Sequence, residues 1–326
     1  MNPSLVSIVI SAYNAEKYIG ETLDAVLAQT WPALEIIVVN DGSADRTREI
    51  AGSYAGHGVK LITQENRGQD AALNNGYRHS TGNYIKFMDS DDLVNPGMIE
   101  AQMKVLNGSE EKLAYGEWAR FYDDKPQLAD FTPLDYWKDA APVDFLTSRP
   151  EGLMLQCGIF LIPRALIERA GLWDERLILF NDTEFFTRLI LASKGVLFSP
   201  GARLYYRSGM NKSISAQRSR KFFESTFLAT SLAGERLLQY EDSTRTRNLI
   251  ANIFLDQHYT MYPSFPDLRK KHEQMIALYG HASIQLKGGK VFMSLKKIFG
   301  WKAAKRMQMF FYKLGYLKFL NRVKPD

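Results

Sequence analysis

The sequence lacks most of the patterns that identify common cofactor and metal chemistries. It has one cysteine, Cys157, which excludes an internal disulfide and favours a reducing compartment. Cys157 lies in an apolar run without a partner at metal-ligand spacing, so a small buried residue is the preferred interpretation. The five histidines are scattered, and no His-Glu-x-x-His, Gly-x-Ser-x-Gly, Gly-x-Gly-x-x-Gly after a strand, or Walker-type loop occurs. Zinc peptidases, serine hydrolases, dinucleotide enzymes and P-loop enzymes are therefore not indicated.

Long hydrophobic runs are also missing. No stretch of about 18 uncharged apolar residues is present, so a membrane-spanning helix is not expected. The apolar run Leu5–Ile10 is too short for the core of a signal peptide, and no basic residue precedes it. The hydrophobic fraction of 45% is ordinary for a globular protein, and 326 residues suit one large domain with an extension. We therefore expect a folded cytoplasmic protein.

The first hundred residues alternate short apolar runs with helical patterns. They predict strands at residues 5–11, 35–40, 59–63 and 84–88, and helices at residues 15–28, 46–54, 70–78 and 96–106. Strands that alternate with helices favour an α/β fold with a largely parallel sheet covered on both faces. Ligands of such sheets bind beyond the carboxyl ends of the strands, so the segments that follow the strands deserve the closest inspection.

The rest of the chain is less regular. We predict strands at residues 114–122 and 155–162, helices at 164–170 and 183–193, and edge strands at 196–199 and 204–207. Residues 123–150 contain four prolines and are expected to form a long loop with short helices. Beyond residue 213 the patterns are helical, at residues 222–238, 246–259 and 290–321, the last with interruptions at Gly300 and Gly315.

Three aspartates follow the fourth predicted strand, in the segment Asp89-Ser90-Asp91-Asp92. Carboxylates this close repel one another unless a cation lies among them. Oxygen ligands at a strand end suit Mg²⁺ or Mn²⁺, which takes its other ligands from water and substrate phosphates. The alternative is a solvated acidic turn in which Asp92 caps the helix near Pro96. The Asp-x-Asp pattern taken alone favours that alternative.

Asp41 follows the second predicted strand, in the segment Asn40-Asp41-Gly42-Ser43. Gly42 suits a turn, and Ser43 or Asp45 suits a cap of the next helix. Asp41 at a strand's carboxyl end also suits a hydrogen bond to a nucleotide base or ribose. Both interpretations can hold together, because the cap accounts for Asp45 and leaves Asp41 available.

Four blocks, taken together, resemble family 2 of the glycosyltransferases, whose fold is of the GT-A type. They are residues 7–14 (SIVISAYN), 35–43 (EIIVVNDGS), 65–68 (ENRG) and 82–92 (GNYIKFMDSDD), and their order and spacing agree with the family. Two later blocks, residues 171–175 (GLWDE) and 181–185 (NDTEF), resemble the segment before the acceptor site and the acidic motif that holds the base.

The resemblance covers roughly residues 4–215. It implies a Rossmann-like, mostly parallel sheet with helices on both faces. Residues 1–215 would form the GT-A catalytic domain, and residues 216–326 a helical C-terminal extension that is basic and amphipathic from about residue 287.

The resemblance implies roles on the donor side of the site. Asp41 would contact the nucleotide base, and Tyr13 with its neighbour Ala12 would line the base pocket. Arg67, in the third block, is a further candidate for substrate binding. UDP is the expected nucleotide of the donor sugar.

Other roles lie where the sugar is transferred. Asp89 and Asp91 match the metal-binding motif of the family, with Asp91 favoured as the direct ligand and Asp89 also a candidate for substrate binding. Asp182 would be the catalytic base, and Glu184 would support it or contact the acceptor.

The chain departs from the family pattern at two places. Asn181 stands where relatives often have glutamate, although the aspartate that follows is intact. The stretch after Tyr205-Tyr206-Arg207 lacks a histidine that in many relatives helps to hold the metal or the diphosphate. Arg207 or Lys212 is the candidate replacement for contact with the diphosphate.

The residues fit an inverting sugar transfer. A single carboxylate can remove the proton of the acceptor hydroxyl, and a divalent ion can stabilise the leaving diphosphate. A glycosidase would instead need an acid to protonate its leaving alcohol. We therefore expect transfer of a sugar from a nucleoside-diphosphate donor to a glycan or lipid-linked acceptor, in cell-surface polysaccharide synthesis.

Two other functions stay open on the residues alone. One is a non-catalytic relative that binds a nucleotide sugar as a partner subunit, which the intact Asp91 and Asp182 argue against. The other is a nucleotidyltransferase. Such an enzyme usually carries a loop rich in glycine and basic residues after the first strand, where this chain has Ser11-Ala12-Tyr13-Asn14.

The end of the chain is strongly basic. From Lys287 onward it has eleven Lys or Arg residues and one acid, a charge of +10 against +5 for the whole chain. Apolar residues recur at helical spacing among these charges, at Ala303, Met307, Phe310, Leu314 and Leu317. The segment is either a helix packed on the catalytic domain or an interfacial helix on an anionic membrane at the inner face. Nucleic acid is not an expected partner, since no recognition motif accompanies the charge.

Overall fold

The structure is a computed structural model, and it describes residues 3–148, 153, 155–209, 219–280, 282 and 289–313. The chain forms two compact units, Met1–Ile250 and Ala251–Asp326. None of the helices in the described ranges combines the length and the apolar character that a bilayer span requires.

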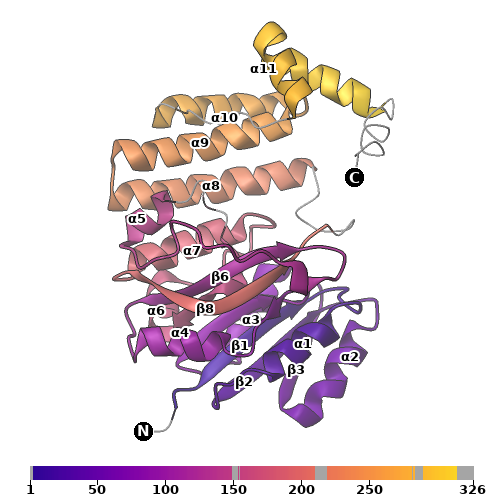
Figure 1. Cartoon of the computed structure of the whole chain (residues 1–326), viewed down its shortest axis with the longest axis vertical. Coiled ribbons are helices and arrows are strands. Elements are labelled where there is room, and N and C mark those ends of the chain that lie inside the picture. Colours follow the sequence, from indigo (N-terminus) through magenta and orange to yellow (C-terminus); the bar gives the residue numbers. More distant parts are fainter. Residues whose placement is uncertain are drawn as a thin grey trace. The chain divides into compact units, whose positions relative to one another are not determined.

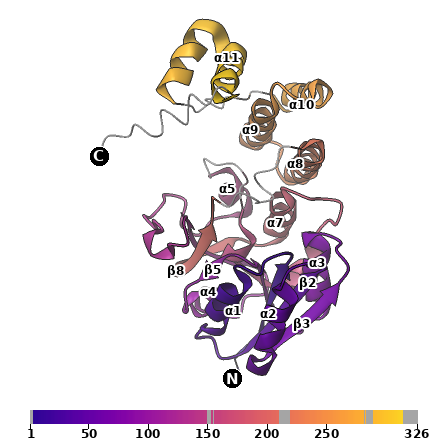
Figure 2. The ribbon, with the colours of Figure 1, turned by 90° about the vertical axis from the view of Figure 1, so that its right-hand side faces the viewer.

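The first unit is built on an eight-stranded sheet with helices on both faces, as Figures 1 and 2 show. The strand order is β3-β2-β1-β4-β7-β6-β8-β5. The first four of these strands are mutually parallel: β1 (Val6–Ala12), β2 (Leu34–Asp41), β3 (Val59–Gln64) and β4 (Tyr84–Asp89). Every residue of β1 is buried, as expected for a central strand covered on both faces. The predicted α/β fold with a largely parallel sheet is therefore confirmed.

The second half of the sheet mixes directions. It contains β5 (Leu93–Val94), β6 (Leu113–Phe121), β7 (Phe160–Pro163) and β8 (Val196–Arg207). β7 runs antiparallel to β4 and β6, whereas β8 runs parallel to β6 and antiparallel to β5. The strand predicted at residues 155–162 starts only at Phe160, because a 3-10 turn, η3 (Cys157–Ile159), precedes it.

The prediction of two edge strands near the end of this half is wrong. They form one strand, β8, which is paired on both sides. Ser199-Pro200-Gly201 resembles a break in the sequence, but Gly201 takes a φ of 78° within the strand. The register with β6 shifts between Tyr115 and Glu117, which absorbs this irregularity.

Helices connect and cover these strands. Those of the first unit are α1 (Ile19–Leu27), α2 (Thr47–Ser53), α3 (Gln69–Arg78), α4 (Met98–Leu106), α5 (Pro142–Thr147), α6 (Arg164–Ala170), α7 (Asn181–Ala192) and α8 (Arg220–Tyr240), with the 3-10 turns η1 (Tyr54–His57) and η2 (Pro126–Leu128). α8 packs on α7. α3 lies close on β1, since a Cβ at Gly76 would come within 2.3 Å of the Cγ1 of Val9.

The helices α9 (Thr244–Met261), α10 (Pro266–Tyr279) and α11 (Lys290–Lys313) follow. We did not predict α10, because Pro263 and Pro266 suggest a break. Pro266 instead occupies the first turn of α10, where its missing N–H costs nothing. The predicted interruption of the last helix at Gly300 is confirmed by a φ of 75° there. Gly315, Leu314 and Leu317 lie outside the described residues, as does Lys212.

Candidate active site

The predicted site residues gather at one edge of the sheet, where the parallel strands end. The register pairs Ser11 with Asp89 and Ala12 with Asn40, so the ends of β1, β2 and β4 lie side by side. Ala12 is buried, and the ring of Tyr13, next along the chain, is 51% exposed. The fold thus brings the first, second and fourth sequence blocks together.

Asp41 is buried at the end of β2 and accepts three hydrogen bonds. Its Oδ1 accepts from Gln64 Nε2 at 2.8 Å and from the backbone N–H of Arg67 at 2.9 Å, and its Oδ2 accepts from the N–H of Gly68 at 2.9 Å. Asp41 therefore holds the loop between β3 and α3. Gly42 beside it has a φ of 70°, and a Cβ there would come within 2.7 Å of the Asn66 nitrogen.

Arg67 extends from that loop into solvent. Its guanidinium Nη2 lies 2.9 Å from an oxygen of Glu175, in an ion pair that is largely exposed. An exposed pair of this kind contributes little to stability, so the arginine can exchange partners at low cost. Its position beside Asp41 is compatible with the predicted role in substrate binding.

The aspartate segment after β4 is held from several sides. Gln69 Nε2 donates to Asp89 Oδ1 at 2.6 Å, and the backbone N–H of Arg207 donates to Asp92 Oδ1 at 3.0 Å. Thr22 of α1 donates to the backbone oxygens of Ser90 and Asp92, at 3.0 Å each. The alternative in which Asp92 caps the next helix is wrong, since Gly97 is the N-cap of α4 and Asp92 is buried against β8.

Burial dominates the electrostatics of these aspartates. It raises the pKa of Asp89 to about 7, with a further rise from the negative charge of Asp91. Burial also raises the pKa of Asp91, although Arg207 opposes the rise, and it raises the pKa of Asp92 well above the ordinary range. The segment would be stabilised by protons or by a cation.

The donor set available for a metal is small. Within the described ranges, no three His, Cys, Asp or Glu side chains gather around one position. Asp89 and Asp91 are two carboxylates at a strand end, and Mg²⁺ is commonly held by one or two carboxylates together with substrate phosphates. The two carboxylates therefore fit a divalent cation that binds together with a phosphate-bearing substrate.

Arg207 supports this segment from β8. Its side chain is buried, and its Nε donates to the backbone oxygen of Asp91 at 2.9 Å. Its Nη2 bonds Glu21 at 2.6 Å, and its Nη1 bonds Asp124. The guanidinium that we considered for the diphosphate thus has protein acceptors on three of its nitrogens.

Asp182 lies in the first turn of α7. Burial raises the pKa of its carboxyl well above the ordinary range, and the charges of Asp89 and Asp70 raise it further. No hydrogen bond reaches this carboxylate from any residue that the structure describes. A carboxylate with a raised pKa and free oxygens has the properties that a general base needs.

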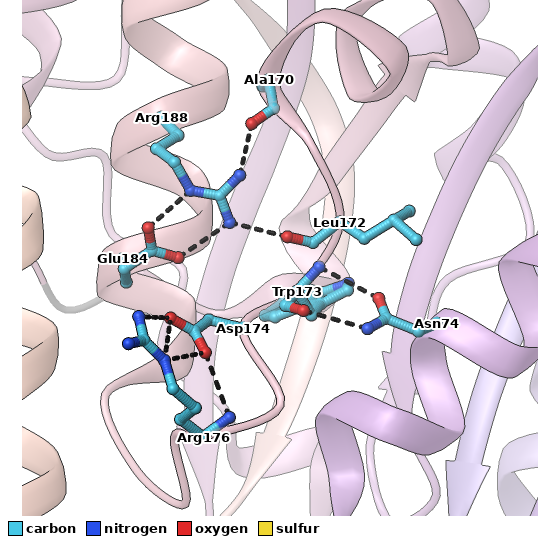
Figure 3. A network of polar contacts seen from close by, with 8 residues as sticks. All are labelled: Asn74, Ala170, Leu172, Trp173, Asp174, Arg176, Glu184 and Arg188. Carbon is cyan, nitrogen blue, oxygen red and sulfur yellow. Dashed lines mark hydrogen bonds and ion pairs between the residues drawn. The ribbon is translucent and has the colours of Figure 1, made fainter.

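Glu184 follows two residues later and is directed into the protein. It forms a buried ion pair with Arg188, whose Nη1 and Nη2 also donate to the backbone oxygens of Ala170 and Leu172 (Figure 3). From the other side, Asn74 of α3 bonds both the N–H and the C=O of Trp173, at 3.0 and 2.9 Å. The segment 170–176 is therefore fixed between α3 and α7.

Sequence reasoning missed two polar residues at the start of α3. Gln69 bonds Asp89, and the buried Asp70 accepts a hydrogen bond of 2.5 Å from Asn181 Nδ2. Burial raises the pKa of Asp70 to about 7. The only signal was a pair of polar residues directly after the third block, which equally suits an exposed first helical turn.

Cys157 was predicted to be a small buried residue, and it is buried. Its thiol lies close enough to Asp89 for the two groups to influence each other's pKa. Burial and the charges of Asp89 and Asp182 raise the pKa of the thiol. A nucleophilic role is disfavoured by these surroundings, because the thiol keeps its proton.

Comparison with known proteins identifies the family. The sequence model described as Glycosyl transferase family 2 matches residues 7–170, half of the chain. The chain belongs to this family. A Rickettsia typhi family member named as an uncharacterized glycosyltransferase is 36% identical over 193 residues, 58% of this chain and 59% of its own. A Rickettsia felis glycosyltransferase of the same description is 30% identical over 266 residues, 76% of this chain and 43% of its own. The chain therefore spans about half the length of these relatives.

The solved structures agree on the fold of this glycosyltransferase. Residues 1–349 of TarS from S. aureus, in complex with UDP-GlcNAc, superpose with a TM-score of 0.67 at 18% identity. The match covers 84% of this chain and 80% of that one. The predicted GT-A fold is confirmed, and the helices after β8 form the helical C-terminal region.

Proposed function

We propose that this family 2 glycosyltransferase transfers a sugar, with inversion, from a nucleoside-diphosphate donor to a hydroxyl of a glycan or lipid-linked acceptor. Cell-surface polysaccharide synthesis is the process that the family resemblance favours. The observation that carries the proposal is the place of Asp182 in the first turn of α7, within the electrostatic influence of Asp89 at the end of β4. Burial raises the pKa of both carboxyls, and the negative charge of Asp89 raises the pKa of Asp182 further.

In the proposed transfer step, each bond that forms is matched by a bond that breaks. The acceptor oxygen forms a bond to the anomeric carbon as the bond from that carbon to the diphosphate oxygen breaks. The hydroxyl proton passes to Asp182, and the nucleoside diphosphate leaves with the bonding electron pair. Asp89 and Asp91 would hold Mg²⁺ or Mn²⁺, which would supply positive charge against the departing diphosphate.

The donor side is proposed to lie over Asp41 and Tyr13. Asp41 fixes the loop at residues 64–68, and the exposed ring of Tyr13 offers an apolar face at the end of β1. UDP is the proposed nucleotide, supported by the UDP-GlcNAc complex of the TarS structure that shares this fold. The sugar itself is left for experiment.

The last described helix supports a membrane-facing role beside a lipid-linked acceptor. In α11, Trp301 packs edge-on against Tyr259 and Tyr262, whereas Ile298 and Phe310 are 71% and 60% exposed. Exposed apolar side chains among lysines fit an anionic lipid surface. Flotation with vesicles that contain about 30% anionic lipid, against neutral vesicles, tests this point. If the protein binds neither the anionic nor the neutral vesicles, α11 is a packing helix and not a membrane-binding one.

A donor screen tests the proposed reaction. Purified protein is mixed with UDP-, GDP- and TDP-sugars, with and without Mn²⁺ or Mg²⁺, and released nucleoside diphosphate is measured. We expect metal-dependent release from one UDP-sugar, which is lost in Asp91→Ala. If the protein binds a donor but releases no nucleoside diphosphate with any acceptor that is added, the non-catalytic partner subunit is favoured instead. If the protein neither binds any donor nor releases nucleoside diphosphate, the proposal is wrong.

A further inference from the structure

Two helices that carry the site are joined by one buried hydrogen bond. Asn181 is the first residue of α7, and its Nδ2 donates to Oδ1 of Asp70 at 2.5 Å. Asp70 lies in the first turn of α3 and is 2% exposed, and Asn181 is 9% exposed. The contact joins positions 111 residues apart, so it depends on the tertiary fold.

The buried carboxylate of Asp70 lowers the stability of the folded protein. Its second oxygen, Oδ2, is buried and has no hydrogen-bond partner within the described part of the chain. A buried carboxylate with one oxygen unpaired costs free energy that an apolar residue would not. Residues that break a packing rule in this way are concentrated at functional sites.

Within the described ranges, the contact with Asp70 is the only side-chain hydrogen bond of Asn181, the first residue of α7. The N-cap of this helix, Phe180, has a φ of 59°, and no side chain among the described residues caps the helix there. The base, Asp182, follows Asn181 directly. Its own carboxylate accepts no described hydrogen bond, so the direction of the first turn determines where its oxygens lie.

The opposite end of the contact adjoins the aspartates of β4. Gln69, the residue before Asp70, donates to Asp89 at 2.6 Å. Two successive residues of α3 thus hold the base-bearing helix and the end of β4. We propose that Asp70 is a positioning residue, which through Asn181 sets the place of Asp182 relative to Asp89. This inference rests on the proposed function, because it assumes that Asp182 is the base.

The residues of α7 that follow Asp182 are anchored without Asp70. Thr183 donates to the backbone oxygen of Leu153 at 2.7 Å, and Glu184 is paired with Arg188. Figure 3 shows that Arg188 also fixes the segment 170–172, which Asn74 of α3 holds through Trp173. Variants of the Asp70–Asn181 pair are therefore expected to fold, with the loss of anchoring confined to Asn181 and Asp182 at the very start of α7.

The test exchanges donor and acceptor between the two positions. Asn181→Asp has nearly the same shape but replaces the donor by a carboxylate that faces Asp70. Assayed at about pH 8, where the two carboxylates share a proton less readily, it should lower kcat for the active donor by about 10²-fold. The KM of the donor should stay within about threefold, because the donor site lies over other strands.

The double variant Asp70→Asn with Asn181→Asp restores the bond with reversed polarity. We expect it to recover kcat to within about tenfold of the wild type, which simple loss of stability would not predict. Ser193→Ala is the matched control. It removes a buried hydrogen bond, from Oγ to the Ile190 oxygen at 2.7 Å, at the far end of the same helix, and should leave kcat unchanged. Circular dichroism at the assay temperature confirms that each variant is folded.

The outcomes separate the two proposals. A folded Asn181→Asp variant with wild-type kcat, in a wild type that is active, overturns the positioning role and leaves the glycosyltransferase function intact. A lowered kcat that the exchange does not recover also overturns it, since the hydrogen bond would not be what matters. An inactive wild type, with every donor, removes the proposed function and the positioning role together.

Discussion

The proposed donor side and the proposed transfer side of this site differ in how the protein holds their carboxylates. Asp41 accepts three hydrogen bonds from protein groups, two of them backbone N–H groups. Among the described residues, Asp182 accepts no hydrogen bond, and one oxygen of Asp70 has no partner. The first carboxylate is satisfied by folding, and its work is to shape a loop. The oxygens of Asp182 and Oδ2 of Asp70 lack such donors in the part of the chain that the structure describes, so protonation would stabilise them.

The difference has a thermodynamic consequence. Hydrogen bonds from backbone amides stabilise an ionised carboxylate, whereas burial without them favours the protonated form. The carboxylates of the proposed transfer side therefore lower the stability of the free protein at neutral pH, as expected where a site trades stability for reactivity. Predictions that alter one side should leave the other unchanged.

The largest effect is expected at the base. Asp182→Asn keeps the shape of the side chain and removes its ability to take a proton, so kcat should fall by about 10²–10⁴-fold. Donor affinity, measured by titration calorimetry with UDP, should change little. Turnover near the wild-type value in this variant would exclude Asp182 from the role.

Removal of divalent cations is expected to be the second largest effect. Chelation should lower the rate of nucleotide release by about 10²–10³-fold, because charge on the leaving diphosphate would lose its stabilisation. Asp91→Ala should be slow with or without added Mn²⁺. If chelated wild type keeps its full rate, the two carboxylates do not act through a metal.

A smaller effect is expected on the donor side. Asp41→Asn places an amide N–H₂ where the N–H of Gly68 now donates, which disturbs the loop at residues 64–68 at a cost of about 1–3 kcal/mol. The KM of the donor should rise about tenfold with kcat nearly unchanged. Glu35→Gln is the matched control, because Glu35 accepts from Ser7 and Thr81 at the opposite end of the same strand. Equal effects from both variants would show only a general loss of stability.

The smallest effect is a dependence of stability on pH. The folded-state pKa of Asp182 is raised above its ordinary value of 3.8. In the interval between the two values the folded protein binds more protons than the unfolded chain, so this group's stabilisation is lost as pH rises. The amide that Asp182→Asn introduces does not titrate. The variant should therefore melt above the wild type by roughly 2–4 °C near neutral pH, and the difference should vanish toward about pH 4. Melting curves without divalent cations measure it, and a difference that is constant with pH would contradict the assigned pKa direction.

The parallel half of the sheet was predictable because its signals are local. Short apolar runs that alternate with amphipathic helices place β1, β2, β3 and β4 almost to the residue, and the blocks that carry the resemblance lie at their ends. The other half was not, because Ser199-Pro200-Gly201 looks like a loop and becomes part of a paired strand. Proline gave the opposite error at α10, where it starts a helix that we did not expect.

The site was predictable only in part, for a related reason. Asp41, Asp89 and Asp182 stand in recognisable blocks, and the fold gathers them at one edge. The residues that hold these aspartates in place do not stand in recognisable blocks. Asp70 reaches Asn181 across 111 residues, and Arg207 bonds Asp91 across 116. No periodicity or spacing reports such contacts, because they arise from how helices and strands pack.

The close contact of α3 with β1 limits how this protein can change. Gly76 and Val9 leave no room for a methyl group between helix and sheet. Any larger residue at position 76 would lift α3, and with it the first turn that bonds both Asp89 and Asn181. Substitution of this glycine would therefore disturb the proposed site from a distance along the helix. Laboratory evolution of new donor preferences should therefore succeed by altering the exposed end of β1 and should find position 76 closed.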